Sequence, residues 1–124
     1  MSKLRHYGIR DKSLNWFESY LTNRKQYVFV NGESSQLRNI NYGVPQGSVL
    51  GPLLFLIYIN DLPNISKVLS FYLFADDTNI YYEAETPEKL ESVLNKELKE
   101  LYTWLIVNRL SLNINKTNFV VFRP

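Results

Sequence analysis

The sequence predicts an α+β fold in which an antiparallel sheet is covered by helices on one face. The chain has 124 residues, enough for one domain with a single hydrophobic core. Its hydrophobic content of 45% and charged content of 21% are typical of a globular protein. Segments with helical spacing alternate along the chain with short strand-like runs and tight turns, which favours the α+β class. No internal repeat or linker interrupts this order, so a single domain over residues 1–124 is expected.

The first part of the chain predicts a helix followed by a two-stranded ribbon. Asp11 is expected to cap a helix with apolar residues at helical spacing, ending near Asn23. A strand is expected over 26–31 and a return strand over 37–42, with Asn31-Gly32 as the turn between them.

The remaining elements are a helix, a hairpin, a second helix and a strand. A short apolar helix is expected over 52–60, and a hairpin over 68–82. Thr86 followed by proline and acidic residues opens a long amphipathic helix of about 20 residues. After a connector, the apolar run Phe119–Phe122 predicts a last strand.

Two adjacent acidic residues, Asp76 and Asp77, stand at the expected tip of the hairpin. Neighbouring carboxylates repel each other, so a turn with no other role more often uses Asn-Gly or Asp-Gly. A divalent cation removes this repulsion, since Mg²⁺ prefers oxygen ligands from one or two carboxylates together with substrate phosphates. On the pair alone, a solvated acidic turn and a metal site both remain open.

A loop rich in glycine and proline runs from Gly43 to Pro52, directly into the apolar helix. Glycine permits backbone conformations and close approaches that a Cβ would block. Gln46 is the one long polar side chain of the loop, and its amide can both donate and accept hydrogen bonds. Such a loop suits the approach of a flat or anionic molecule. Taken alone, however, an ordinary loop before a core helix is the favoured interpretation.

At this spacing, the two motifs together resemble the reverse transcriptases of non-LTR (LINE-type) retrotransposons. Further blocks agree with the family in the same order along the chain. The matching blocks are Trp16-Phe17, Tyr20-Leu21, Asn23–Val28, Gly43–Phe55, Ile59–Pro63, Phe74–Asp77, Trp104, Leu110–Asn113 and Asn115–Thr117. The family's fold is the polymerase palm, so the resemblance implies a partial palm with the acidic hairpin at its centre.

The resemblance implies two-metal transfer of a nucleotide from a dNTP to the 3′-hydroxyl of a DNA primer on an RNA template. One ion activates the hydroxyl and the other steadies the leaving pyrophosphate. Mg²⁺ is the expected cofactor, and Mn²⁺ could replace it. In the family, a third carboxylate comes from a strand that would precede residue 1 here. We therefore expect the first catalytic strand and the thumb to be missing, the rest of the polymerase to be a partner, and the isolated chain to be inactive.

The resemblance gives nine residues a role. Asp76 is the expected direct metal ligand, with Asp77 as second ligand or outer-shell partner, and both are catalytic. Lys116 would protonate or neutralise the departing pyrophosphate, a solvated loop lysine being the alternative. The residues expected to contact the incoming nucleotide are Gln46, Gly47, Phe74 and Ala75. Arg24 and Lys25 are expected to contact template phosphates, the alternative being that both are ordinary surface residues.

Net charge, cysteine content and hydropathy neither indicate nor exclude an enzyme that acts on nucleic acid. The net charge is only +2, so phosphate contacts would depend on local basic residues. The absence of cysteine excludes disulfides and fits an intracellular protein of the nucleus or cytoplasm, and no signal peptide is visible. The longest apolar run, residues 49–59, is far shorter than the roughly 20 residues that span a bilayer, so no membrane partner is expected.

Two alternatives stay open. A small antiparallel α+β module could bind single-stranded nucleic acid without catalysis, with Tyr72, Tyr81 and Tyr82 as a stacking platform. The chain could also be a degenerate relic of a retroelement, although both motifs are intact. Magnesium dependence of binding separates the first alternative from a polymerase.

Overall fold

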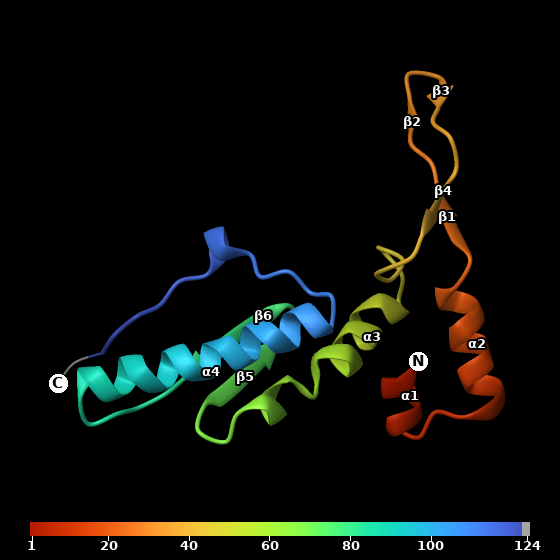
Figure 1. Cartoon of the computed structure of the whole chain (residues 1–124). Helices are drawn as coiled ribbons and strands as arrows, with labels where there is room; N and C mark the ends of the chain where they lie inside the picture. Colours follow the sequence, from red (N-terminus) through yellow and green to blue (C-terminus); the bar gives the residue numbers. More distant parts are fainter. Residues whose placement is uncertain (123–124) are drawn as a thin grey trace. The chain divides into compact units, whose positions relative to one another are not determined.

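The structure is a computed structural model that describes residues 1–122 (Figure 1). The chain divides into two compact units, Met1–Ile59 and the segment from Asn60 onward, and each is described by itself. Both contain helices and short antiparallel strand pairs. The predicted α+β class is therefore confirmed, whereas the expectation of one domain stays a prediction.

The first unit has a small core made by three helices, α1 (Ser2–His6), α2 (Asp11–Leu21) and α3 (Leu50–Ile59). One leucine from each helix is buried: Leu4, Leu14 and Leu54. Half-buried apolar side chains, among them Val44 and Leu50, pack against these leucines. The segment that enters α3 thus rests directly on the core of its unit.

The side chain of Lys3 links α1 to the C-terminal end of α3. Its Nζ donates to the Tyr58 carbonyl oxygen at 2.5 Å and lies 4.5 Å from the centroid of the Tyr58 ring. A cation at this end donates to a carbonyl of the last helical turn and opposes the partial negative charge of the helix terminus.

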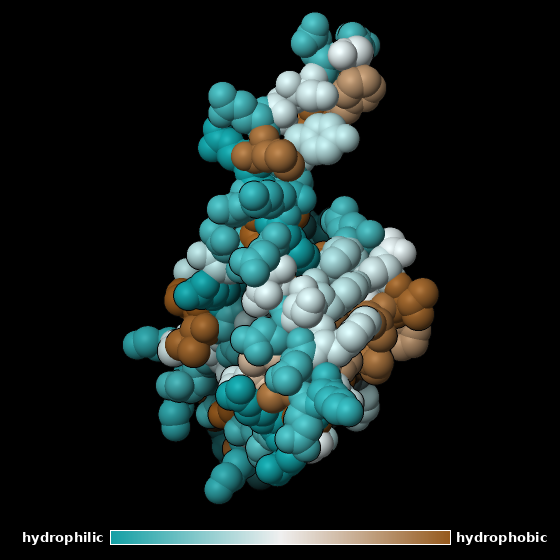
Figure 2. Space-filling view, turned by 90° about the vertical axis from the view of Figure 1, so that its right-hand side faces the viewer, coloured by the Kyte–Doolittle hydropathy of each residue, from teal (hydrophilic) through white to brown (hydrophobic). Residues whose placement is uncertain are grey.

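The ribbon between α2 and α3 consists of two strand pairs. β1 (Arg24–Gln26) pairs antiparallel with β4 (Arg38–Ile40), and β2 (Phe29–Val30) pairs with β3 (Glu33–Ser34). Asn31 and Gly32 both have positive φ, as the predicted two-residue turn requires. The ribbon extends away from α2 and α3 (Figure 1), and its outer part exposes apolar side chains at the top of Figure 2. These are Tyr27, Val28, Phe29 and Val30, each more than half exposed.

The second unit combines a long helix with the acidic hairpin. Its elements are the 3-10 helix η1 (Leu62–Ile65), strands β5 (Ser70–Phe74) and β6 (Asp77–Tyr81), helix α4 (Pro87–Val107) and the 3-10 helix η2 (Ile114–Lys116). Thr86 caps α4, its Oγ1 accepting the backbone N–H of Lys89 at 3.2 Å, as the sequence predicts. Leu62, Leu69 and Leu101 are buried, and α4 contacts η1.

Two local predictions are wrong. Asp11 does not cap α2: Arg10 precedes the helix in extended conformation without a side-chain cap bond, and Asp11 is already the first helical residue. Phe119–Phe122 forms no strand. All four side chains are about half exposed or more, and β5 pairs with β6 alone. Apolar composition favours a strand only where a partner supplies backbone hydrogen bonds, and none pairs with this segment.

Candidate functional site

The acidic pair lies at a tight two-residue turn between β5 and β6. Phe74 pairs with Asp77, so Ala75 and Asp76 form the turn itself. Ala75 has a φ of +52°, the region that the first turn residue of a type II′ hairpin occupies. Asp76 and Asp77 are exposed, and neither carboxylate accepts a hydrogen bond or forms an ion pair within residues 1–122. The turn therefore presents two adjacent carboxylates without a protein partner.

Asp77 shares one face of the hairpin with exposed aromatic side chains. Side chains opposite each other in an antiparallel pair point to the same face. The register pairs Phe74 with Asp77, Tyr72 with Asn79 and Ser70 with Tyr81. Phe74 is 80% exposed, Tyr72 65% and Tyr81 52%. Tyr82, which the sequence also suggested for this platform, is half-buried.

Gln46 and Gly47 lie at the exposed outer part of the loop before α3. Gly43 and Gly47 have φ of +74° and +75°, and no atom lies within 4 Å of a Cβ built on either residue. Backbone conformation, rather than lack of space, therefore requires glycine at both positions. The Gln46 side chain is exposed and forms no hydrogen bond within the described residues. Both ends of its amide are free to bind a ligand.

Ser48 fixes the end of this loop that enters α3. Its Oγ donates to the Pro45 carbonyl at 2.7 Å and accepts the Gly51 N–H at 3.0 Å. A Cβ at Gly51 would lie 3.1 Å from that oxygen. This role of Ser48 was not predicted from the sequence, although a serine shortly before a helix is a recognised capping signal.

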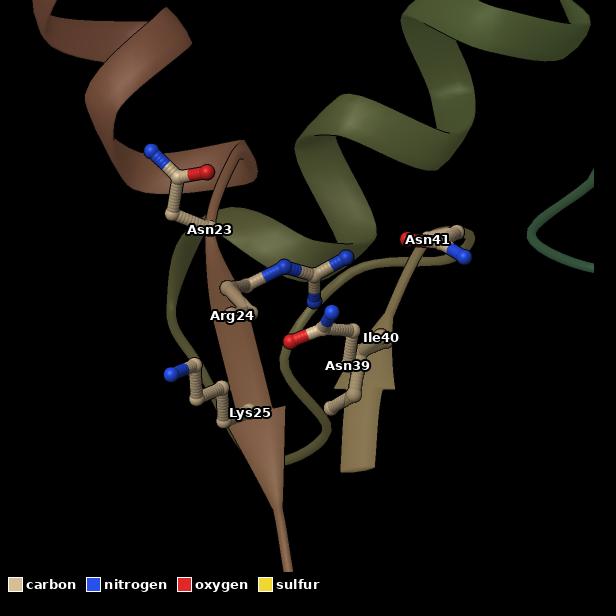
Figure 3. Close-up of a pocket in the computed structure, with 6 residues that line it drawn as sticks. All are labelled: Asn23, Arg24, Lys25, Asn39, Ile40 and Asn41. Atoms are coloured by element: carbon tan, nitrogen blue, oxygen red, sulfur yellow. The ribbon is translucent and has the colours of Figure 1, made fainter. Parts of the chain in front are cut away.

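Arg24 and Lys25 lie side by side on β1, at a pocket lined by Asn23, Arg24, Lys25, Asn39, Ile40 and Asn41. Their side chains extend in different directions (Figure 3). Arg24 reaches across toward the segment that follows β4, and its guanidinium donates to backbone carbonyls of Leu21, Tyr42 and Gly43. Lys25 is exposed, and its ammonium group has no hydrogen-bond or ion-pair partner within the described residues. Only Lys25 thus presents its whole charged group to a phosphate.

Lys116 ends the 3-10 helix η2 and is exposed. No ion pair joins it to Asp76 or Asp77 within the part of the chain that the structure describes. In residues 1–122, no group of three or more histidine or acidic side chains lies close enough to hold a metal ion. The hairpin brings Phe74, Ala75, Asp76 and Asp77 together, and the loop before α3 keeps Gln46 beside Gly47.

Residues 1–122 match the family model described as reverse transcriptase (RNA-dependent DNA polymerase). The chain is 30% identical to the RNA-directed DNA polymerase from mobile element jockey of Drosophila melanogaster over 112 residues, which cover 85% of this chain. It is 32% identical to the probable RNA-directed DNA polymerase from transposon X-element, and 34% identical to that from transposon BS, both of the same fly. These matches cover 85% and 90% of the chain.

The chain belongs to the reverse transcriptase family, and its relatives confirm the predicted resemblance to polymerases of non-LTR retrotransposons. It spans 12% of the length of each of these three relatives. No solved structure matches the chain. Enzymes of this family use divalent metal ions and bind an RNA template and nucleotides. Among the described helices, none is both long and apolar enough to cross a membrane.

Proposed function

We propose that this chain forms part of the active site of an RNA-directed DNA polymerase, in which Asp76 and Asp77 hold a divalent metal ion, Mg²⁺ or Mn²⁺. The observation that carries the proposal is the pair of exposed carboxylates at the hairpin turn, which have no partner in residues 1–122. Adjacent carboxylates repel each other, and a hard cation offsets that repulsion with the ligand type it prefers. The donor set therefore fits such an ion.

The other proposed site residues suit a primer end and a nucleotide. Ions bound there would stabilise the negative charge that develops during phosphoryl transfer. Phe74 is exposed on the face of Asp77, so its ring can contact the primer terminus. Ala75 is small and leaves room beside the carboxylates. Gln46 and Gly47 would line the nucleotide pocket, because the loop is open there and the Gln46 amide is free.

Two basic residues are proposed to bind phosphate groups. The exposed Lys116 would neutralise or protonate the departing pyrophosphate, and Lys25 would contact the template backbone. A metal ion with its substrate needs more oxygen ligands than two adjacent carboxylates supply. We therefore propose that a third carboxylate comes from another part of the polymerase, and that this chain alone binds metal without extending a primer.

The test is a titration of the full chain with Mn²⁺, followed by paramagnetic broadening of backbone amide signals. We expect broadening centred on residues 74–78 and its loss in the Asp76→Asn/Asp77→Asn variant. The control variant Glu83→Gln/Glu85→Gln also removes two exposed carboxylates and should leave the broadening unchanged. Equal broadening in the Asp76→Asn/Asp77→Asn variant would overturn the metal site. Extension of a primed RNA template by the chain alone would overturn the dependence on other segments.

A second function, binding of single-stranded nucleic acid without catalysis, is favoured by the exposed Tyr72 and Tyr81 on one face of the hairpin. Stacking of a base on an aromatic ring contributes about 1–3 kcal/mol. If the aromatic face acts alone, Tyr72→Ala/Tyr81→Ala weakens RNA binding and Mg²⁺ has no effect. If the polymerase site acts, binding rises with Mg²⁺ in the unmodified chain but not in Asp76→Asn/Asp77→Asn. Tyr102→Ala, on α4 and 57% exposed, is the control.

A further inference from the structure

We propose that Arg24 is a positioning residue for the loop that carries Gln46 and Gly47, rather than a contact to template phosphates. The proposal rests on the proposed function insofar as that loop lines the nucleotide pocket. Its structural basis is independent of any ligand, because all the partners of Arg24 belong to the backbone of this chain.

The guanidinium of Arg24 joins three separate points of the backbone. Its Nε donates to the carbonyl oxygen of Leu21, the last residue of α2, at 3.1 Å. Its Nη2 donates to the carbonyl oxygens of Tyr42 at 3.2 Å and of Gly43 at 2.5 Å. The side chain is half-buried and reaches across the strand pair of β1 and β4 (Figure 3). One arginine thus ties the end of a helix to the beginning of the loop.

The geometry of these contacts favours arginine over lysine. A guanidinium is planar and presents several N–H donors in a fixed fork, so one side chain can reach carbonyls that lie in different directions. An ammonium is a compact charge on a flexible stem and cannot hold the same three carbonyls in this arrangement. The carbonyl of Leu21 also lies at a helix C-terminus, where a cation is favourable.

The loop is therefore held at both ends, with the proposed nucleotide contacts between them. At its start, Arg24 binds the Gly43 carbonyl, and Gly43 has the positive φ that lets the chain turn there. At its other end, Ser48 bonds to Pro45 and Gly51. Gln46 and Gly47 lie between these anchors, and the Gln46 side chain forms no hydrogen bond within the described residues. Their conformation depends on the anchors, which reduces the cost of ordering them around a ligand.

Lys25 provides a matched control. It is the next residue on β1, carries the same charge and is exposed, and its side chain has no bonded partner within the described part of the chain. Arg24→Gln and Lys25→Gln each remove one positive charge, but only the first removes backbone contacts. Arg24→Lys keeps the charge and removes the fork. The three variants therefore separate loss of charge from loss of positioning.

The experiment measures amide hydrogen exchange over residues 42–48 in the full chain and in these three variants. We expect exchange about tenfold faster in both Arg24→Gln and Arg24→Lys, and no change in Lys25→Gln. Amides of α4 serve as the reference for global unfolding and should stay unchanged. Exchange at the original rate in Arg24→Lys would overturn the proposal, because a point charge would then suffice.

A measurement on the unmodified chain covers variants that fail to fold. The Nε–H of Arg24 should give a resolved NMR signal that exchanges slowly with water, because it donates to the Leu21 carbonyl. Exchange as fast as that of Arg10 or another exposed arginine would overturn the proposal. Affinity for Mg²⁺-dNTP then tests the link to function, and both Arg24 variants should lose about tenfold relative to the unmodified chain. Absence of dNTP binding in the unmodified chain would count against the proposed function alone, whereas binding with unaltered loop exchange in the Arg24 variants would count against positioning alone.

Discussion

The two segments that carry the proposed functional residues are built in opposite ways. The loop before α3 is held by contacts within its own unit. Val44 packs on the core, Ser48 bonds to Pro45 and Gly51, and Arg24 donates to the Gly43 carbonyl. The turn at Ala75-Asp76 is exposed, and its carboxylates have no partner in the described residues. Internal bonds fix the loop, whereas the hairpin strands alone fix the turn.

This difference indicates which segment needs a ligand to complete its interactions. A loop that hydrogen bonds within the protein anchor at both ends can be preorganised before a nucleotide arrives. Two adjacent carboxylates without a counter-charge keep their mutual repulsion until a cation binds. We infer that the core and the hydrogen bonds around the loop contribute to the stability of the fold, whereas the carboxylates of the turn contribute to metal affinity. Substitutions should therefore affect folding strongly near the loop and weakly at the turn.

The largest expected effect is at the core beneath the loop. Leu54→Ala removes one of three buried leucines that form this core and should lower the free energy of unfolding by about 2–5 kcal/mol. Leu53→Ala, on the same helix but half exposed, should cost less than about 1 kcal/mol. Chemical denaturation followed by Trp16 fluorescence measures both. Equal effects of the two substitutions would show that the core does not support the loop.

Next comes the loop's own anchor. Ser48→Ala removes the bonds to Pro45 and Gly51 and should cost about 1 kcal/mol, with faster exchange of the amides around them. Ser66→Ala provides the control in the other unit, since its Oγ accepts the N–H groups of Val68 and Leu69. It should have a similar cost, with faster exchange at those two amides only. If Ser48→Ala left exchange around the loop unaltered, the loop would not be held by this side chain.

Sequence patterns predicted the elements that depend on local chemistry. The Asn31-Gly32 turn, the capping of α4 by Thr86 and the acidic hairpin all follow from residue types at fixed offsets, and the structure has each of them. The failures have different causes: the cap predicted at Asp11 is absent, because Arg10 precedes α2 and Asp11 is already its first residue. The strand at Phe119–Phe122 needed a partner that composition cannot reveal, and α1 is too short for periodicity to detect.

The site shows the same division. The motif places Asp76 beside Asp77 and Gln46 beside Gly47, because these pairs are contiguous in sequence. It could not indicate that Arg24 bonds to carbonyls 18 and 19 residues away while Lys25 stays exposed. Both are cations in a basic segment, and only the strand pairing determines which of them faces the loop backbone.

A smaller effect is expected at the turn backbone. Ala75 has a φ of +52°, which costs an alanine about 1–2 kcal/mol and a glycine almost nothing. Glycine also adds conformational entropy to the unfolded chain, so Ala75→Gly should stabilise the second unit by a net of about 0.5 kcal/mol. Ala84→Gly, without a positive φ, should have only the entropic cost and destabilise slightly. Thermal unfolding of both variants checks the sign, and destabilisation by Ala75→Gly would contradict the strain.

The smallest effect on folding is expected at the carboxylates themselves. Without divalent ions, Asp76→Asn/Asp77→Asn should leave the free energy of unfolding within about 0.5 kcal/mol, since both side chains are exposed and lose no internal bond. A ligand that binds only the folded state stabilises it by RT ln(1 + [L]/Kd). At a Mg²⁺ concentration equal to its Kd, the unmodified chain should therefore gain about 0.4 kcal/mol and the variant nothing. Denaturation with and without Mg²⁺ measures this difference, and Glu83→Gln/Glu85→Gln should keep the full gain. A large loss of stability in metal-free buffer would mean that the carboxylates support the fold, and the contrast between the two segments would then be wrong.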